Sequence, residues 1–320
     1  MSTLAKPLHA VLGTGPLARA TAEALLARGM AVRLINTSGR MTEEPAGATV
    51  IAANLLDPAA AHSALTGASV VHFCAQPPYH QWVEKFAPLQ DAVIAATRRA
   101  GARLIVAENL YGYGPSKAPF REDMPLAPNT AKGRVRAQMH RTLMAEHDKG
   151  NLPVAVARAA DFFGPHVEGS AVGARAMKAV TAGKPAEVMG NTDMPHAYTF
   201  IADFGMAMAV LGTNDSALGQ VWHVPNAPAV STRQFFELAF QAAGRPSAGV
   251  RRMGRLELQV IGLFVPPVRE SIEMLYEFEE PFLVDHSKYV AAFGNHATPL
   301  QAALARTLTG PQTSPRPEQK

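Results

Sequence analysis

The sequence predicts an α/β fold with a doubly wound parallel sheet and a smaller C-terminal lobe. Short apolar segments alternate with helix-patterned segments throughout the first half of the chain. A glycine-rich turn follows the first apolar segment, and the alternation breaks down after residue 165. Strands that alternate with helices at this spacing form a parallel sheet that helices cover on both faces.

The elements of the first half follow from apolar runs and from helical spacing. The expected strands are short apolar runs at 8–13, 31–36, 48–55, 69–75 and 102–109. The expected helices lie between them, at 16–29, 57–67 and 86–101. In the first helix Leu17, Ala20 and Leu25 share one side, and Gly29 ends the helix.

The sequence of the second half predicts fewer regular elements than that of the first. They are a long helix that begins near Lys132, strands within 152–165 and at 219–225, and a helix at 231–244. Ser231 or Thr232 is expected to cap the last of these helices. The Met and aromatic residues of 269–282 fit a helix face packed on the core. The tail, 309–320, lacks apolar periodicity and is expected to be disordered.

Composition favours a soluble protein. The net charge of +4 comes from 30 Lys plus Arg against 26 Asp plus Glu, and no long basic run carries interleaved aromatics, so we expect no nucleic-acid partner. The apolar stretch 260–268 is too short to span a bilayer and contains Pro266 and Pro267, so we expect no membrane insertion. The lone cysteine, Cys74, fits a reducing compartment, and we expect a cytoplasmic location.

The stretch GTGPLA, residues 13–18, has the spacing of a dinucleotide-binding turn. The first glycine permits a tight turn, the second lets the backbone approach a pyrophosphate, and Ala18 allows the helix to pack closely on the strand. The free N–H groups at the start of the helix favour phosphates. The alternative is a purely structural turn. The expected cofactor contacts are Gly13, Thr14, Gly15, Pro16 and Leu17.

The end of the second expected strand bears on the choice of dinucleotide. NAD-binding folds place an Asp or Glu there for the ribose hydroxyls. This chain has Asn36, Thr37, Ser38 and Arg40 instead. Hydroxyls and an arginine accept a 2′-phosphate through charge-assisted hydrogen bonds. The sequence therefore predicts NADP(H) rather than NAD(H), unless Arg40 is simply a solvated loop residue.

Four further segments carry a resemblance to a known family. They are VVHFCAQ (70–76), ENLYGYGP (108–115), RAADFFGP (158–165) and PHAYTFIADFGMAM (195–208). With the glycine turn, they make the chain resemble the extended short-chain dehydrogenase/reductases, the NAD(P)-dependent epimerase/dehydratase family, from Ala10 to about residue 297.

The resemblance implies an organisation, a partner and more cofactor contacts. It implies a Rossmann-type domain over 1–165 and 195–230, and a substrate lobe over 166–194 and 231–308. It also implies a homodimer formed through the long helices that begin near 86 and 132. The further cofactor contacts that it implies are Asn54, Leu55, Cys74, Ala75, Gln76, Lys132, Arg136 and Asp161.

The chain departs from the family at the catalytic positions. The family places Ser or Thr at the end of the fifth strand and Tyr-x-x-x-Lys on the next helix. This chain has Ala107, Lys132 and Arg136 there. Asn54 and Asp161 also replace the family's usual acid and asparagine. The one Tyr-x-x-x-Lys spacing in this region, Tyr113 to Lys117, contains glycine and Pro115, so we do not expect it to form a helix.

Reduction of a carbonyl needs a group that supplies a proton to the oxygen. We expect Lys132 to replace the tyrosine, with Tyr111 and Tyr113 as further candidates. Arg136 stays charged, so it could hold a ribose or a phosphate but could not act as an acid. The alternatives are a surface lysine at 132 and tyrosines that only pack the turn.

Other candidates lie nearby or are isolated. Tyr79 and His80 follow the fourth expected strand and should lie on the same side of the sheet as the cofactor. His196 and His223 are isolated and fit structural roles. No His, Cys and Asp residues have metal-ligand spacing, so we expect no metal.

The sequence therefore predicts an NADP(H)-dependent oxidoreductase that acts on a small carbonyl or alcohol, with Lys132 in place of tyrosine. Two alternatives stay open. One is a non-enzymatic NADP(H)-binding redox sensor, because all three catalytic positions are changed. The other is a nucleotide-sugar epimerase or dehydratase, by family analogy alone.

Overall fold

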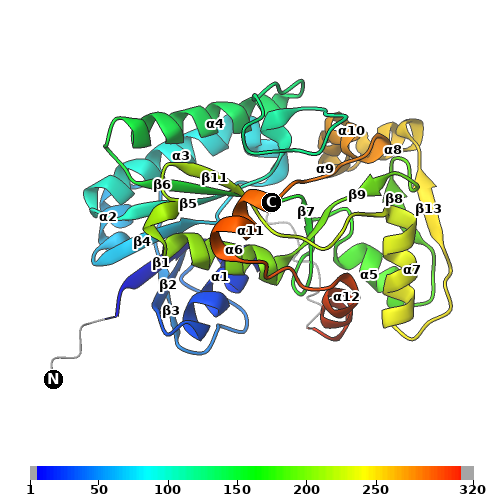
Figure 1. Cartoon of the computed structure of the whole chain (residues 1–320), viewed down its shortest axis with the longest axis horizontal. Coiled ribbons are helices and arrows are strands. Elements are labelled where there is room, and N and C mark those ends of the chain that lie inside the picture. Colours follow the sequence, from blue (N-terminus) through cyan, green and yellow to red (C-terminus); the bar gives the residue numbers. More distant parts are fainter. Residues whose placement is uncertain (1–5, 311–320) are drawn as a thin grey trace.

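A parallel sheet forms the centre of the computed structural model, which describes residues 6–310 (Figure 1). Its strands in that range are β1 (Leu8–Leu12), β2 (Ala31–Asn36), β3 (Ala48–Ala52), β4 (Ala68–Phe73), β5 (Arg103–Glu108), β6 (Val154–Arg158) and β11 (Gln220–His223). They are ordered β11-β6-β5-β4-β1-β2-β3, and every neighbouring pair is parallel. The chain winds outward from β1 in both directions, which confirms the predicted fold class.

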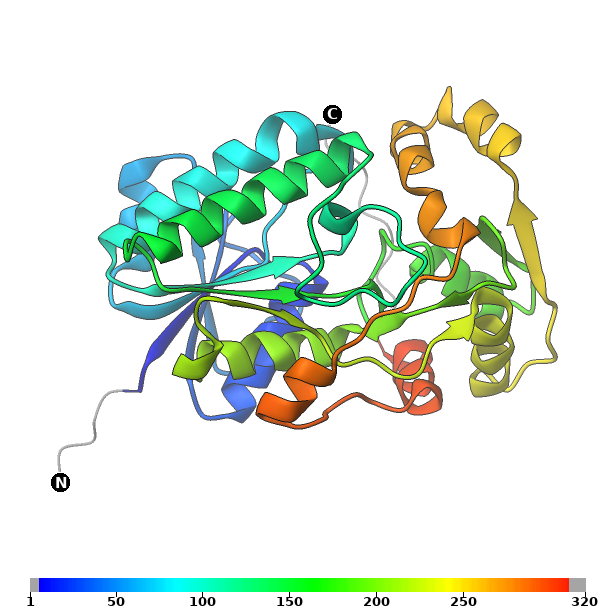
Figure 2. The ribbon, with the colours of Figure 1, turned by 45° about the horizontal axis from the view of Figure 1, so that its top comes forward.

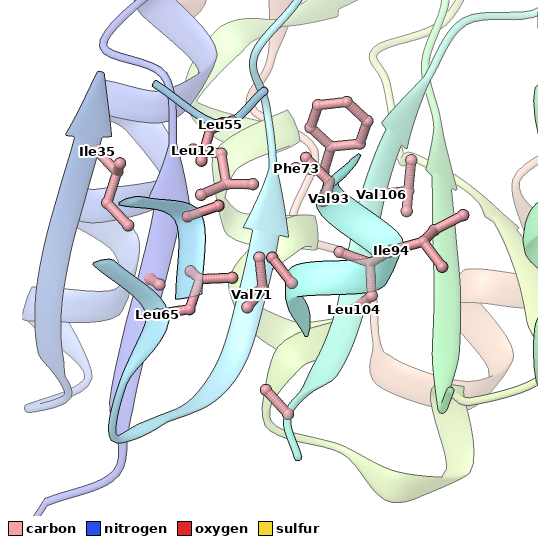
Figure 3. Close-up of a cluster of buried hydrophobic side chains, with 14 of the residues drawn as sticks. Leu12, Ile35, Leu55, Leu65, Val71, Phe73, Val93, Ile94, Leu104 and Val106 are labelled. Carbon is pink, nitrogen blue, oxygen red and sulfur yellow. The ribbon is translucent and has the colours of Figure 1, made fainter. Parts of the chain in front are cut away.

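Helices cover both faces of this sheet (Figure 2). α2 (Pro58–Leu65), α3 (Trp82–Arg99) and α4 (Ala131–Asp148) lie on one face, and α1 (Pro16–Ala27) and α6 (Ile201–Gly212) lie on the other. Figure 3 shows the core of the first face, where Leu12, Val71 and Leu104 of neighbouring strands meet Val93 and Ile94 of α3. Alternate strand residues point to opposite faces, so both faces must be apolar.

α1 and α6 pack at backbone contact. A Cβ atom added at Gly205 of α6 would lie 2.4 Å from the carbonyl carbon of Ala20 in α1. Small residues on both helices allow this approach, which fixes α1, the helix that the glycine turn leads into.

The C-terminal lobe surrounds a second apolar core. Its helices are α5 (Ala174–Thr181), α7 (Thr232–Ala242) and α12 (Leu300–Thr309). Its strand pairs are β8 (Ala186–Met189) with β13 (Val250–Met253), β7 (Asp161–Phe163) with β10 (Tyr198–Phe200), and β9 (Pro195–His196) with β12 (Val230–Ser231). Ser231 caps α7 through a capping box with Gln234, as its sequence position predicts.

The structure differs from the expected elements in three places. The helix expected from residue 86 begins at Trp82, and 152–165 contains two strands, β6 and β7. The segment 269–282 is not one helix but a chain of short ones, α9 (Pro266–Ser271), η4 (Ile272–Met274) and α10 (Tyr276–Glu279). Of the expected tail, Thr309 ends α12, and 311–320 lies outside the described residues.

The remaining short elements connect these layers. They are η1 (Tyr79–Gln81), η2 (Tyr111–Tyr113), η3 (Asp215–Ala217), α8 (Arg255–Gly262) and α11 (Ser287–Phe293). Within residues 6–310, no helix combines the length and the apolar character that crossing a membrane requires.

We expect Gly205→Ala to lower the free energy of unfolding by about 1–3 kcal/mol, because the new methyl group meets backbone atoms of α1 that cannot move aside. Urea unfolding followed by circular dichroism measures the change. Gly254→Ala is the matched control, since a Cβ there has no atom within 4 Å. Equal stabilities of the two variants would contradict the close packing of α1 on α6.

Candidate functional site

A cavity of about 340 Å³ lies at the carboxyl ends of β1, β4 and β5. The glycine turn, the residues that follow β4 and β5, and residues of the C-terminal lobe all line it. Ligands of open α/β sheets bind at this edge of the sheet. The predicted cofactor contacts that line the cavity are Gly13, Thr14, Gly15, Pro16, Leu17, Cys74, Ala75, Gln76, Arg136 and Asp161.

The glycine turn has the geometry of a phosphate cradle. Gly13 has a φ of 102°, and a Cβ there would lie 3.2 Å from the Cα of Ala75. Gly15 is the N-cap of α1, and a Cβ there would have no atom within 4 Å. No side chain caps α1, so its first N–H groups have no side-chain acceptor. These N–H groups and the helix dipole can hold a pyrophosphate.

The residues after β2 lie beside the turn rather than in the cavity. Asn36 donates hydrogen bonds to the Thr14 hydroxyl (2.8 Å) and to the Arg40 carbonyl oxygen (2.8 Å). Thr37, Ser38 and Arg40 are exposed. No described residue accepts a hydrogen bond from the Arg40 guanidinium, which leaves this cation free for an anion.

Two other predicted cofactor contacts lie outside the cavity. Asn54 is exposed and uses its side-chain oxygen to accept a hydrogen bond from the Leu56 N–H (3.1 Å). Leu55 is buried in the core under α2 and α3. Neither residue lines the cavity.

Lys132, the predicted proton donor, is not among the residues that line the cavity. Its side chain is 1% exposed, and its ammonium donates to the Glu270 carboxylate (2.7 Å), the Glu270 carbonyl oxygen (3.2 Å) and the Glu273 carboxylate (2.9 Å). The three N–H groups of the ammonium therefore all have acceptors on α9 and η4. This arrangement connects the two lobes and leaves no donor for a substrate.

Arg136, one helical turn further along α4, does line the cavity. Its guanidinium lies over the rings of Trp82 (4.4 Å) and Phe86 (4.2 Å) of α3. It is buried, and its Nε has no hydrogen-bond partner among the described residues. Burial lowers the pKa of Arg136 to about 10, so the group is still a cation at neutral pH. A buried cation with an unused donor is suited to hold an oxygen-rich or anionic ligand.

The two predicted tyrosines have different surroundings. Tyr111 and Tyr79 both line the cavity. Burial raises the pKa of both phenols, so both keep their protons at neutral pH. Tyr113 lies outside the cavity, where its hydroxyl is hydrogen-bonded to Nε2 of His223 (2.9 Å). His80 is not among the lining residues either.

The sequence prediction missed an acidic residue in the cavity. Glu277 of α10 is buried, and its Oε1 has no hydrogen-bond partner among the described residues. Burial, and after it the neighbouring Asp161 carboxylate, raise the pKa of Glu277 well above its usual value. The only signal in the sequence was an acid within an aromatic-rich segment, which the prediction assigned to the core. No motif marked it.

His196, predicted to be structural, holds this side of the cavity together. Its Nε2 is 2.9 Å from Asp161 Oδ2, and its Nδ1 is 3.2 Å from the Glu277 carbonyl oxygen. Its ring is stacked between Phe278 (4.8 Å) and Phe282 (4.9 Å). The imidazole therefore joins β7 to α10.

Comparisons with known proteins agree with this geometry. Residues 11–224 match the model of the NAD dependent epimerase/dehydratase family. A comparison with curated proteins finds no significant match.

Solved structures are similar over nearly the whole chain. One is a Thermus thermophilus UDP-glucose 4-epimerase in complex with NAD, with 18% identity, a TM-score of 0.75, and coverage of 94% of this chain and 97% of that one. Another is a Streptomyces venezuelae dTDP-glucose 4,6-dehydratase, with 14% identity, a TM-score of 0.77, and coverage of 94% and 95%. A third is a Pseudomonas aeruginosa nucleoside-diphosphate-sugar epimerase, with 17% identity, a TM-score of 0.73, and coverage of 94% and 96%. At these identities the likeness shows the fold.

We expect Arg136→Met to weaken binding of NADPH by about tenfold or more, because a hydrogen bond to a charged group contributes about 1.5–3 kcal/mol and about 1.4 kcal/mol is tenfold. Fluorescence titration of the folded variant measures the dissociation constant. Arg136→Lys should keep most of the affinity, and Arg134→Met, an exposed position on the same helix, should keep all of it. Undiminished binding by Arg136→Met would show that the guanidinium only packs against α3.

Proposed function

The chain belongs to the NAD dependent epimerase/dehydratase family of enzymes, and we propose that it is an NADP(H)-dependent oxidoreductase that acts on a small carbonyl or alcohol substrate. The observation that carries the proposal is one cavity in which a phosphate-binding turn, a buried free cation and a pair of phenols meet. These are the groups that a dinucleotide and a reacting oxygen require.

The residues present fit a bound dinucleotide. The N–H groups at Gly15 and in the first turn of α1 would hold the pyrophosphate, and Arg136 would hold the ribose of the nicotinamide half. The exposed Thr37, Ser38 and Arg40 would hold the 2′-phosphate. When bound, the dinucleotide supplies the hydride that a carbonyl gains or takes the one that an alcohol loses.

The cavity favours a small substrate with an uncharged reacting end. Its volume of about 340 Å³ is at the low end for ligand pockets and must also hold the nicotinamide. Aromatic rings, among them Tyr79, Trp82 and Phe282, form much of its wall. The Asp161 carboxylate would repel a carboxylate placed beside it.

The phenols of Tyr79 and Tyr111 orient the substrate oxygen in this proposal. Both keep their protons at neutral pH, so each can donate a hydrogen bond to that oxygen. Ala107, which replaces the family's hydroxyl residue, lines the cavity but offers no donor. Lys132 acts as a positioning residue: its ammonium lies 4.7 Å from the Tyr79 ring centre and holds α9 and η4 in place.

The second candidate function is a nucleotide-sugar epimerase or dehydratase. The observation that favours it is the set of similar solved structures, which includes the three nucleotide-sugar enzymes named above. In such a reaction the dinucleotide is restored in each turnover. Net consumption of NADPH with small carbonyls supports the first candidate, whereas conversion of UDP-glucose or dTDP-glucose without net change of the dinucleotide would support the second.

We expect the protein to bind NADPH at least tenfold more tightly than NADH, because Arg40 offers an unpaired guanidinium to a 2′-phosphate. Arg40→Ala should lose this preference through weaker NADPH binding alone. Parallel fluorescence titrations with NADPH and NADH measure both constants, and NADH serves as the internal control. A wild-type preference for NADH would contradict the assignment of Arg40.

We expect Tyr111→Phe to lower kcat for a carbonyl substrate by about 100-fold, because the oxygen loses a donor in the transition state. Lys132→Met should instead lower Tm, because two carboxylates then face one another without their cation. NADPH oxidation with a panel of small aldehydes and ketones, beside thermal unfolding, separates the two effects. Tyr113→Phe, outside the cavity, should keep kcat within a few-fold. A Lys132→Met variant with wild-type Tm and no activity would restore Lys132 as the proton donor.

A further inference from the structure

One acidic side chain of the C-terminal lobe enters the cavity without a partner. Glu277 is 2% exposed and lines the cavity. Its Oε1 is buried and accepts no hydrogen bond from any described residue. A buried polar group normally has a hydrogen-bond partner. An unpartnered carboxyl in a binding cavity therefore indicates that a ligand forms the missing hydrogen bond or that the group is protonated.

The turn that precedes Glu277 is anchored on α4. Glu273 accepts hydrogen bonds from the Ala131 N–H (2.7 Å) and from the Lys132 ammonium (2.9 Å), at the first turn of α4. Docking of Glu273 on α4 holds η4 in place, and α10, which follows η4, carries Glu277 into the wall of the cavity.

A second anchor fixes the other side of the same turn. His196 contacts the Glu277 carbonyl oxygen, and its ring is stacked on Phe278 and Phe282. The carboxyl thus extends from a backbone held at both sides, which suits a group that must meet a substrate in one geometry.

The surroundings of Glu277 favour its un-ionised form. The titratable groups that act on it or that it acts on are Asp161 of β7, Tyr79 of η1, Tyr111 of η2 and Tyr276 of α10. The Asp161 carboxylate is already paired with His196 (2.9 Å). No lysine, arginine or histidine side chain among the described residues forms an ion pair with Glu277. Burial and the negative charge of the nearby Asp161 carboxylate both oppose ionisation of Glu277.

The other candidate proton donors of the site are excluded by their chemistry or their contacts. Lys132 has all three N–H groups engaged by Glu270 and Glu273. Arg136 does not release a proton. Burial raises the pKa of Tyr79 and Tyr111, which makes them hydrogen-bond donors that resist ionisation.

We propose that Glu277 is the catalytic acid and base of this site, and that it exchanges its carboxyl proton with the oxygen of a small, uncharged carbonyl or alcohol substrate held by the tyrosine pair. The inference rests on the proposed function and adds the proton donor that the family's missing tyrosine would otherwise supply. In reduction, the O–H bond of Glu277 breaks and an O–H bond forms on the substrate oxygen. The C=O π bond opens as the carbon gains the hydride that NADPH supplies. The carboxylate then regains a proton from water, and alcohol oxidation runs the same exchange in reverse.

The protonation of Glu277 can be tested without a substrate. Infrared difference spectra of wild type minus Glu277→Gln, in the protein alone and with NADPH, report the C=O stretch of an un-ionised carboxylic acid. We expect this band at pH 7 and its loss at alkaline pH. If no such band is present at pH 7, Glu277 is ionised and cannot donate, and the inference is overturned.

The catalytic role needs turnover and a pH profile. With a carbonyl from the panel that oxidises NADPH, Glu277→Gln should lower kcat about 100-fold or more while the dissociation constant of NADPH stays the same. Glu277→Asp should restore part of kcat, and the fall of kcat/KM at alkaline pH should be absent in Glu277→Gln. The control is Glu280→Gln, an exposed acid three residues away.

The outcomes separate this inference from the function on which it rests. Wild-type kcat in Glu277→Gln would overturn the inference and leave the oxidoreductase proposal intact. A panel that gives no turnover with any carbonyl or alcohol would overturn the proposed function, and the proton step with it.

Discussion

A buried ion pair at the ends of two central strands positions the site. Glu108 ends β5 and Arg158 ends β6, the two residues are paired in register, and the guanidinium Nε lies 2.9 Å from the carboxylate. Burial would raise the pKa of Glu108, but Arg158 and His140 outweigh it and hold the pKa at about 2. Arg158 also lies over the Tyr113 ring, whose hydroxyl is bonded to His223 at the end of β11. Leaving either charge of such a pair alone costs about 3–5 kcal/mol, so the turn that carries Tyr111 is firmly placed.

The site that follows from this framework is assembled from both lobes. The first lobe provides the glycine turn, Tyr79, Tyr111 and Arg136 of α4, whereas α10 provides Glu277. One link between the lobes is the Lys132 ammonium, which binds two carboxylates of the C-terminal lobe. At the position where the family places its tyrosine, this chain therefore has a structural contact. The same contact between α4 and η4 that engages Lys132 also holds the turn that precedes Glu277.

Part of the site could be predicted because it depends on short spacings. The glycine turn, Ala107, Arg136 and Tyr111 each lie a fixed number of residues from a strand end or a helix start, and all of them line the cavity. The role of Lys132 could not be predicted in this way. Its partners lie 138 and 141 residues further along the chain, and nothing local marks them. Glu277 was assigned to the core for the same reason, since aromatic residues around an acid look alike in a core and in a cavity wall.

Apolar period, glycine placement and helix caps are local properties, so the sequence by itself determined the doubly wound sheet, the order of its elements and the phosphate-binding turn. Contacts between the lobes depend on how segments more than a hundred residues apart meet. Only the tertiary structure could show that Lys132 forms ion pairs with Glu270 and Glu273. Only it could show that Tyr113 is hydrogen-bonded to His223 outside the cavity and that Glu277 lines the cavity. The physical reason is that burial and charge pairing, which decide what an ionisable group can do, arise from neighbours in space rather than in sequence.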